Sequence, residues 1–189
     1  MAERAVVLRR LIHVSLALSL VYYLVPDPLP LVRISKGSGV LVLVGIVTVA
    51  EAIRLKRGWR FFLFRDYEMK RPAAYYQLGV GCAAALVAFP MKYAILTILG
   101  VCFADPVIGI VRAGPKARWA FAAGFGVWVA AAIIACAALT LPVPIGLIVL
   151  GAAAAVAVEP IRFPTLDDDL TMNLVPLVLI TLVGAALPA

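Results

Sequence analysis

Charged residues are scarce in this sequence. Only 14% of its 189 residues are Asp, Glu, Lys or Arg, whereas soluble domains contain roughly 25%. Hydrophobic residues make up 65% of the chain, and its mean hydropathy is +1.07. A water-soluble fold could not bury so much apolar surface. The composition therefore excludes a soluble domain and predicts an integral membrane protein partnered with the lipid bilayer.

Cysteine is also infrequent, and its placement argues against a cysteine metal site. Cys82, Cys102 and Cys136 lie inside apolar runs without metal-ligand spacing, which favours ordinary core residues over a redox role. The formal net charge of +7 would suit a nucleic-acid partner. However, the basic residues flank apolar runs, as topology signals of membrane proteins do. No nucleic-acid partner is expected.

Seven apolar segments are candidate membrane spans, since about 20 residues cross the hydrocarbon core. They lie at roughly 5–25, 39–55, 73–90, 92–112, 119–140, 143–158 and 172–188. The first has basic residues before it, like a signal peptide, but lacks a small-residue cleavage site and is interpreted as a retained helix. Because the connections are short, residues 1–189 are expected to form a single transmembrane domain, an all-α polytopic helical bundle.

The charges indicate the orientation of these spans. With a cytoplasmic N-terminus, all but Arg33, Lys36 and Lys92 of the 17 basic residues fall inside, as the positive-inside rule requires. An odd number of spans then places the C-terminus outside. Of the ten acidic residues, all but Asp27 fall on or near the same side, which that rule does not require. This pattern predicts a cytoplasmic-face site for a metal and an anion, in the cell membrane or an endomembrane such as the ER.

Asp105 is the most informative position. It lies inside an apolar run, where a carboxylate costs roughly 2.5–3.5 kcal/mol on insertion scales. Pro106 follows and removes a backbone hydrogen bond, so a kinked or broken helix is expected. These features favour a Mg²⁺ or phosphate site. The alternative is a structural ion pair with Arg112, seven residues later.

A second acidic group follows the sixth apolar segment. Glu159 precedes the run Asp167, Asp168 and Asp169. Adjacent carboxylates repel one another unless they are hydrated or bind cations, and such hard oxygen ligands suit Mg²⁺. A solvated loop with Asp169 near the start of the last helix is equally compatible.

Several basic and polar residues complete the set of candidates. Arg112, Lys116 and Arg118 lie in a Gly/Pro turn that could bind phosphates, although it is not a P-loop. Glu51 and Arg54 are spaced to pair on one helix, which favours a structural role. His13, one turn inside the first span, is compatible with either packing or function. Residues at about 56–72 mix aromatic and basic side chains, as in an interfacial helix on anionic lipid.

The order of these motifs resembles the dolichol kinase, phytol kinase and CTP-dependent diacylglycerol kinase family across nearly the whole chain. The motifs are Arg9-Arg10-Leu-Ile-His13, Glu51-Ala-Ile-Arg54, Arg65-Asp-Tyr-Glu68, Tyr75-Tyr76-Gln-Leu-Gly79, Asp105 with Gly109, and Glu159 with Asp167-Asp168-Asp169-Leu170-Thr171. The chain departs from the family pattern after Lys116, where no glutamate follows, and at Asp169, where the family prefers Asn.

The resemblance implies phosphoryl transfer from CTP to a polyprenol-type lipid alcohol, with Mg²⁺, at the cytoplasmic membrane face. Such transfer requires metal carboxylates, phosphate-binding cations and an oriented hydroxyl. The residues assigned to catalysis are Asp105, Glu159 and Asp168, with Asp105, Asp168 and Asp169 binding the metal. Those assigned to the nucleotide are Arg65, Arg112, Lys116 and Arg118. Those assigned to substrate positioning or support are His13, Glu51, Arg54 and Glu68.

Other functions remain open from the sequence. A membrane phosphatidate-type cytidylyltransferase would use the same metal and CTP but would release pyrophosphate. A small membrane transporter would also contain a proline-interrupted helix, but it would place charges near the midplane and contain internal repeats. Neither feature is evident in the sequence. A purely structural role is the remaining alternative.

Overall fold

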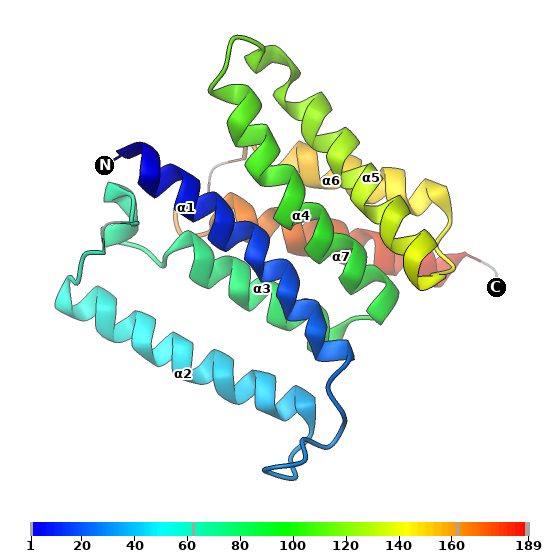
Figure 1. The fold of residues 1–189 in the computed structure, drawn as a ribbon, viewed down its shortest axis with the longest axis horizontal. Coiled ribbons are helices and arrows are strands. Elements are labelled where there is room, and N and C mark those ends of the chain that lie inside the picture. The colour runs from blue at the N-terminus through cyan, green and yellow to red at the C-terminus, as the bar shows by residue number, and fades with distance from the viewer. Residues whose placement is uncertain (1, 62, 162, 188–189) are drawn as a thin grey trace.

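The computed structural model describes residues 2–61, 63–161 and 163–187, excluding the side chains of residues 2–4. The described chain is helical and contains no strand (Figure 1). Its elements are α1 (Ala2–Ser15), η1 (Leu16–Tyr23), α2 (Lys36–Arg57), η2 (Asp66–Met69), α3 (Ala74–Ala88), α4 (Met91–Arg112), η3 (Ala117–Trp119), α5 (Ala120–Leu139), α6 (Ile145–Val158) and α7 (Asp168–Ala186). The all-α prediction is therefore confirmed.

Five helical stretches are long and apolar enough to cross a membrane. They are Ala5–Tyr23, Lys36–Arg57, Met91–Arg112, Ala117–Leu139 and Asp168–Ala186. The other two apolar helices, α3 and α6, have 15 and 14 residues, and at 1.5 Å per residue they extend only about 21–23 Å. All seven predicted segments are thus helical, and five of them reach spanning length within the described residues.

The helix ends differ from expectation at three places. Helix α4 continues through Pro106 to Arg112, so of the two predicted alternatives, a kink or a break, the break does not occur. The last helix begins at Asp168, four residues before the expected 172, because acidic residues in the first turn interact favourably with the helix dipole. The first segment becomes a 3₁₀ helix after Ser15 and ends at Tyr23.

The segment after α2 is not the expected interfacial helix. Its only regular element among the described residues is the one-turn η2; Phe62 lies outside those residues. Phe64 stacks on Tyr75 of α3, with ring centroids 5.7 Å apart. The Arg54 guanidinium lies over the Phe64 ring, 4.5 Å from the ring centroid. These aromatic and cation–π contacts hold the segment against α3, so its aromatic residues are used partly for internal packing.

The core forms around α4, which contacts α5, α7 and α1. Gly100 of α4 faces the fully buried Trp128 of α5 so closely that an added Cβ would overlap the indole ring. Small residues of this kind allow close helix approach inside membranes. Helix α2 packs mainly on α3 and lies at the edge of the bundle (Figure 1). Its exposed side chains, including Leu41, Ile46 and Val49, are apolar, as expected for a surface in contact with lipid.

The helix directions bring several chain segments to one end of the bundle. The starts of α3 and α7 meet the end of α4 and the residue after α6 there, beside α1. Residues of α1, α3, α4 and α7, together with Glu159 directly after α6, line a common cavity. Antiparallel neighbours thus place residues far apart in sequence side by side. This end carries the site described below.

Candidate functional site

A cavity of about 300 Å³ lies at this end of the bundle. It is open on one side and combines charged with apolar walls. Its lining residues are Val6, Arg9, Arg10, Ile12, His13, Leu63, Arg65, Ala74, Tyr75, Leu78, Asp105, Pro106, Gly109, Arg112, Glu159, Asp167, Asp168 and Asp169.

Three carboxylates from three helices meet in this cavity. Asp105 belongs to α4, Glu159 directly follows α6, and Asp168 is the first residue of α7. One oxygen from each lies within 4.8 Å of the others. The structure therefore brings together the residues assigned to catalysis from the sequence. Their oxygen-only donor set is the type that Mg²⁺ prefers.

His13 extends the acidic group from the opposite wall. Its Nε2 lies 3.2 Å from the Val101 carbonyl oxygen. Its Nδ1 lies 3.6 Å from Asp169 Oδ2 and 3.8 Å from Asp105 Oδ2. His13, Asp105 and Asp169 form a second group whose ligand atoms lie within 4.8 Å of one another. Asp105 belongs to both groups.

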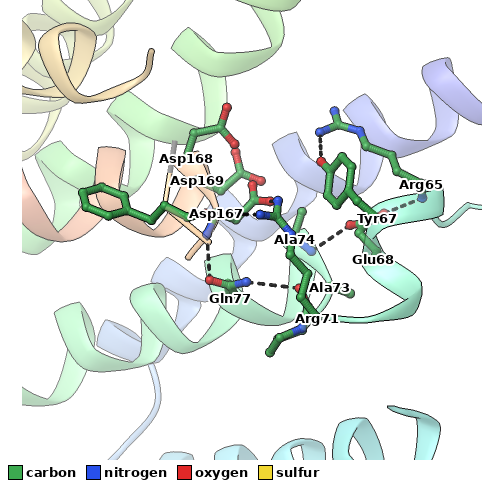
Figure 2. A network of polar contacts seen from close by, with 12 residues as sticks. Arg65, Tyr67, Glu68, Arg71, Ala73, Ala74, Gln77, Asp167, Asp168 and Asp169 are labelled. Atoms are coloured by element: carbon green, nitrogen blue, oxygen red, sulfur yellow. Dashed lines mark hydrogen bonds and ion pairs between the residues drawn. The ribbon is translucent and has the colours of Figure 1, made fainter. Parts of the chain in front are cut away.

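The segment that leads to the three consecutive aspartates is anchored to α3 and to Arg71 before it. The side chain of Gln77 accepts a hydrogen bond from the Asp167 backbone N–H at 2.8 Å and donates one to the Thr165 carbonyl at 3.2 Å. Arg71 donates to Asp167 Oδ2 at 2.9 Å. Figure 2 shows the Arg71 and Gln77 side chains reaching Asp167 while Asp168 and Asp169 continue beside it.

The Asp167 side chain is buried next to another carboxylate. It is 2% exposed, and its Oδ1 accepts no hydrogen bond from the described residues. Burial, followed by the neighbouring Asp168 carboxylate, raises the pKa of Asp167 to about 7, while Arg71 opposes the shift. Crowded acidic groups of this kind are stabilised by a nearby cation.

Arg112 is the cationic residue most directly placed at the carboxylates. Its Nη2 donates to Glu159 Oε2 at 2.7 Å. The alternative pairing of Arg112 with Asp105, considered from their sequence spacing, is not the contact that forms. Arg65 also lines the cavity, together with Arg9 and Arg10. Arginine side chains, a residue type suited to phosphate groups, therefore lie next to a group of carboxylates.

Glu51 and Arg54 form a buried ion pair that does not line the cavity. Arg54 donates to both oxygens of Glu51, at 2.7 and 2.8 Å. It also donates to the backbone carbonyl of Glu68 at 3.0 Å, and Glu51 accepts from the Ala73 N–H at 2.7 Å. The Glu68 side chain accepts from the Ala74 N–H and from Arg9. These buried bonds fix the end of α2 and the start of α3, which in turn positions the cavity wall.

Two of the residues assigned to the nucleotide lie elsewhere. Lys116 and Arg118 are exposed in the turn after α4 and do not line the cavity. The Arg118 guanidinium instead lies 5.6 Å from the Trp119 ring centroid. Of the basic turn, only Arg112 reaches the site.

Sequence reasoning did not assign Arg9, Arg10, Asp167, Arg71 or Gln77 to the site. Arg9 and Arg10 were visible as the opening of the family motif, and their spacing from His13 signalled one helix face. Asp167 was visible in the acidic run. Gln77 was visible inside the Tyr75–Gly79 motif, although its contact with Asp167 was not. Arg71 gave no signal, because its contact joins positions 96 residues apart.

No family model, no curated protein and no solved structure matches this chain.

Proposed function

We propose that this protein is a CTP-dependent lipid-alcohol kinase. It transfers the γ-phosphoryl group of CTP to the hydroxyl of a polyprenol-type, dolichol-like lipid at the cytoplasmic face of the membrane. The supporting observation is the convergence of Asp105, Glu159 and Asp168 with Arg112 and Arg65 in one cavity at one end of an apolar bundle.

The two kinds of cavity wall suit two kinds of substrate. The charged wall provides carboxylates for a cation and arginines for phosphates, which are the main requirements of phosphoryl transfer. The other wall contains Val6, Ile12, Leu63 and Leu78. Helix α1 beside it has few buried residues, since only 6% of its spanning window lies inside the bundle. A lipid tail can thus remain in the bilayer while its hydroxyl reaches the charged wall.

The residues present fit a Mg²⁺ ion by donor chemistry. Asp105, Glu159 and Asp168 offer only oxygen ligands, and the neighbouring Asp167 has a buried carboxylate oxygen without a hydrogen bond from the described residues. When bound, Mg²⁺ would neutralise charge on the nucleotide phosphates. Asp105 and Asp168, both assigned to the metal from the sequence, would hold it. Asp169, the third residue assigned to the metal, lies instead in the group with His13 and Asp105.

The reaction itself requires few covalent roles from the protein. The lipid hydroxyl oxygen forms a bond to the γ-phosphorus, and the bond from that phosphorus to the bridging β–γ oxygen breaks. CDP leaves with the bonding electron pair. A carboxylate of the Asp105–Glu159–Asp168 group accepts the hydroxyl proton, while Arg112 and Arg65 bind phosphate oxygens.

The proposal includes a membrane arrangement. The chain crosses the membrane seven times, with α3 and α6 as short spans, a cytoplasmic N-terminus and an external C-terminus. The support is the charge distribution: Asp27, Arg33, Lys36 and Lys92 lie at the bundle end opposite the cavity, given the helix directions. The membrane is the cell membrane, or an endomembrane such as the ER.

Product analysis tests this function. Purified protein is incubated with Mg²⁺, mixed lipid alcohols, phosphatidate and CTP labelled either at the γ- or at the α-phosphate. We expect γ-label in a lipid phosphate and α-label in CDP, with weaker transfer from ATP. Lipid carrying the α-label together with pyrophosphate release would identify a cytidylyltransferase instead, and no transfer to any lipid would refute both. Asp27→Asn, at the opposite end, is the matched active control.

A further inference from the structure

His13 has a geometry typical of a metal ligand. It is the only histidine in the chain, and 10% of its side chain is exposed. The contact of Nε2 with the Val101 carbonyl at 3.2 Å requires a proton on Nε2, because a carbonyl can only accept. In neutral His13, the lone pair of Nδ1 therefore faces the cavity. Metal-binding histidines characteristically donate their second N–H to a carbonyl or carboxylate in this way.

The distances from Nδ1 indicate a gap rather than a bond. Asp169 Oδ2 and Asp105 Oδ2 lie 3.6 and 3.8 Å away, which is longer than a hydrogen bond between these atoms. Ligands at about 2.1 Å from one ion are separated from each other by about 3.0–3.4 Å. Small side-chain movements would therefore allow these three atoms to bind one cation.

This group is distinct in chemistry from the oxygen-only group. Asp105, Glu159 and Asp168 provide three carboxylates, whereas His13, Asp105 and Asp169 provide two carboxylates and an imidazole. Asp105 has two carboxylate oxygens and can bridge both groups. Its partners in the mixed group come from α1 and the first turn of α7, and its partners in the oxygen-only group come from the residue after α6 and the same turn of α7.

We propose that the cavity contains a second cation site, formed by His13, Asp105 and Asp169, which binds a divalent first-row transition ion next to the oxygen-only site. Imidazole suits transition ions such as Fe²⁺ or Zn²⁺ rather than Mg²⁺, whereas carboxylates suit both Mg²⁺ and Mn²⁺. The role of this cation in turnover rests on the proposed kinase function; its binding rests on the geometry alone. In turnover, a second cation would allow Asp105, Asp168 and Asp169 to remain ionised beside one another and beside a nucleotide phosphate.

A charged His13 without a metal is the competing account. Protonated at Nδ1, it would form a long ion pair with Asp105 and Asp169. This account predicts no bond between His13 nitrogen and a bound ion, so a spectroscopic measurement of that bond separates the two.

The experiment uses Mn²⁺ as the probe and the full chain in detergent, purified through a tag without histidine. Because the chain has one histidine, any imidazole nitrogen coupled to bound Mn²⁺ belongs to His13. We expect about two Mn²⁺ per chain by titration, and a ¹⁴N coupling in pulsed electron paramagnetic resonance. Labelling with ¹⁵N-histidine should convert the ¹⁴N coupling to the ¹⁵N pattern.

Two variants assign the sites. His13→Gln should abolish the nitrogen coupling and reduce the stoichiometry to one, whereas Glu159→Gln should weaken the oxygen-only site and retain the coupling. Asp27→Asn should leave both unchanged. Bound Mn²⁺ without nitrogen coupling in the wild-type protein, or binding unchanged in His13→Gln, would overturn the proposal. No nucleotide or lipid is present, so absence of kinase activity would leave this result standing, and absence of the coupling would leave the kinase proposal standing.

Discussion

Replacing Asp105 with asparagine removes one charge from the centre of the site while keeping the side-chain shape. We expect turnover to fall by about three orders of magnitude and the fold to be retained. Asp105 is shared by both groups of potential ligands. Its ion pair with His13 is long, at 3.8 Å, so little direct bonding is lost.

The magnitude follows from the spacing of the ligand atoms. These atoms lie within 4.8 Å of one another, so a cation among them is within about 4 Å of the Asp105 carboxylate. At 4 Å and an effective dielectric constant of about 20, a carboxylate interacts with each unit of the cation's charge by about 4 kcal/mol, which is the smallest loss expected for a divalent ion. Because each 1.36 kcal/mol corresponds to a tenfold change, this amounts to about 10³-fold in rate.

The assay is initial-rate kinase activity at saturating Mg²⁺-CTP, with thermal unfolding measured on the same samples. Without metal, the Tm of Asp105→Asn should equal or slightly exceed that of the wild type, since Glu159, Asp168 and Asp169 no longer face a fourth carboxylate. Added Mg²⁺ at a hundred times its Kd should stabilise the wild type by about 2.7 kcal/mol and the variant by much less.

Asp168→Asn should have nearly the same effect on rate, and the double variant should be little worse than either single one, because residues acting as a unit are not additive. Asp27→Asn should remain active. If monodisperse Asp105→Asn keeps most of the wild-type turnover, the reasoning is wrong. Asp105 would then be only a structural neighbour of His13.

Three further outcomes are expected. Arg112→Ala should raise the KM for CTP roughly tenfold or more in steady-state kinetics, since a charged hydrogen bond contributes about 1.5–3 kcal/mol; an unchanged KM would remove Arg112 from the nucleotide site. Gln77→Leu leaves the Asp167 N–H unpaired and should lower the Tm. It should also lower the Mg²⁺ affinity by about 10–100-fold in titration calorimetry, and retention of full affinity would contradict a positioning role for Gln77. Gly100→Ala should destabilise the fold by about 1–3 kcal/mol or more through overlap with Trp128, and an unchanged Tm in detergent would contradict the described α4–α5 packing.

Composition and periodicity were enough to predict the fold class. An apolar residue fraction of this size permits a helical membrane bundle, since helices satisfy their backbone polar groups internally. The positions of all seven helices followed from the apolar runs and their flanking Pro and charged residues. Asp105 was identified as a candidate site residue because placing a carboxylate in an apolar run costs insertion free energy, so such residues usually have a function.

Contacts between distant segments required the tertiary structure. The pairing of Arg112 with Glu159 rather than Asp105 depends on α4 and α6 ending side by side. The anchoring of Asp167 by Gln77 joins residues 90 positions apart. The orientation of His13 toward Asp105 and Asp169 depends on how α1 packs on α4. Local propensity determines where a helix lies along the chain. Side-chain packing between helices determines which face of a helix meets which partner, and that packing depends on residues spread over the whole sequence.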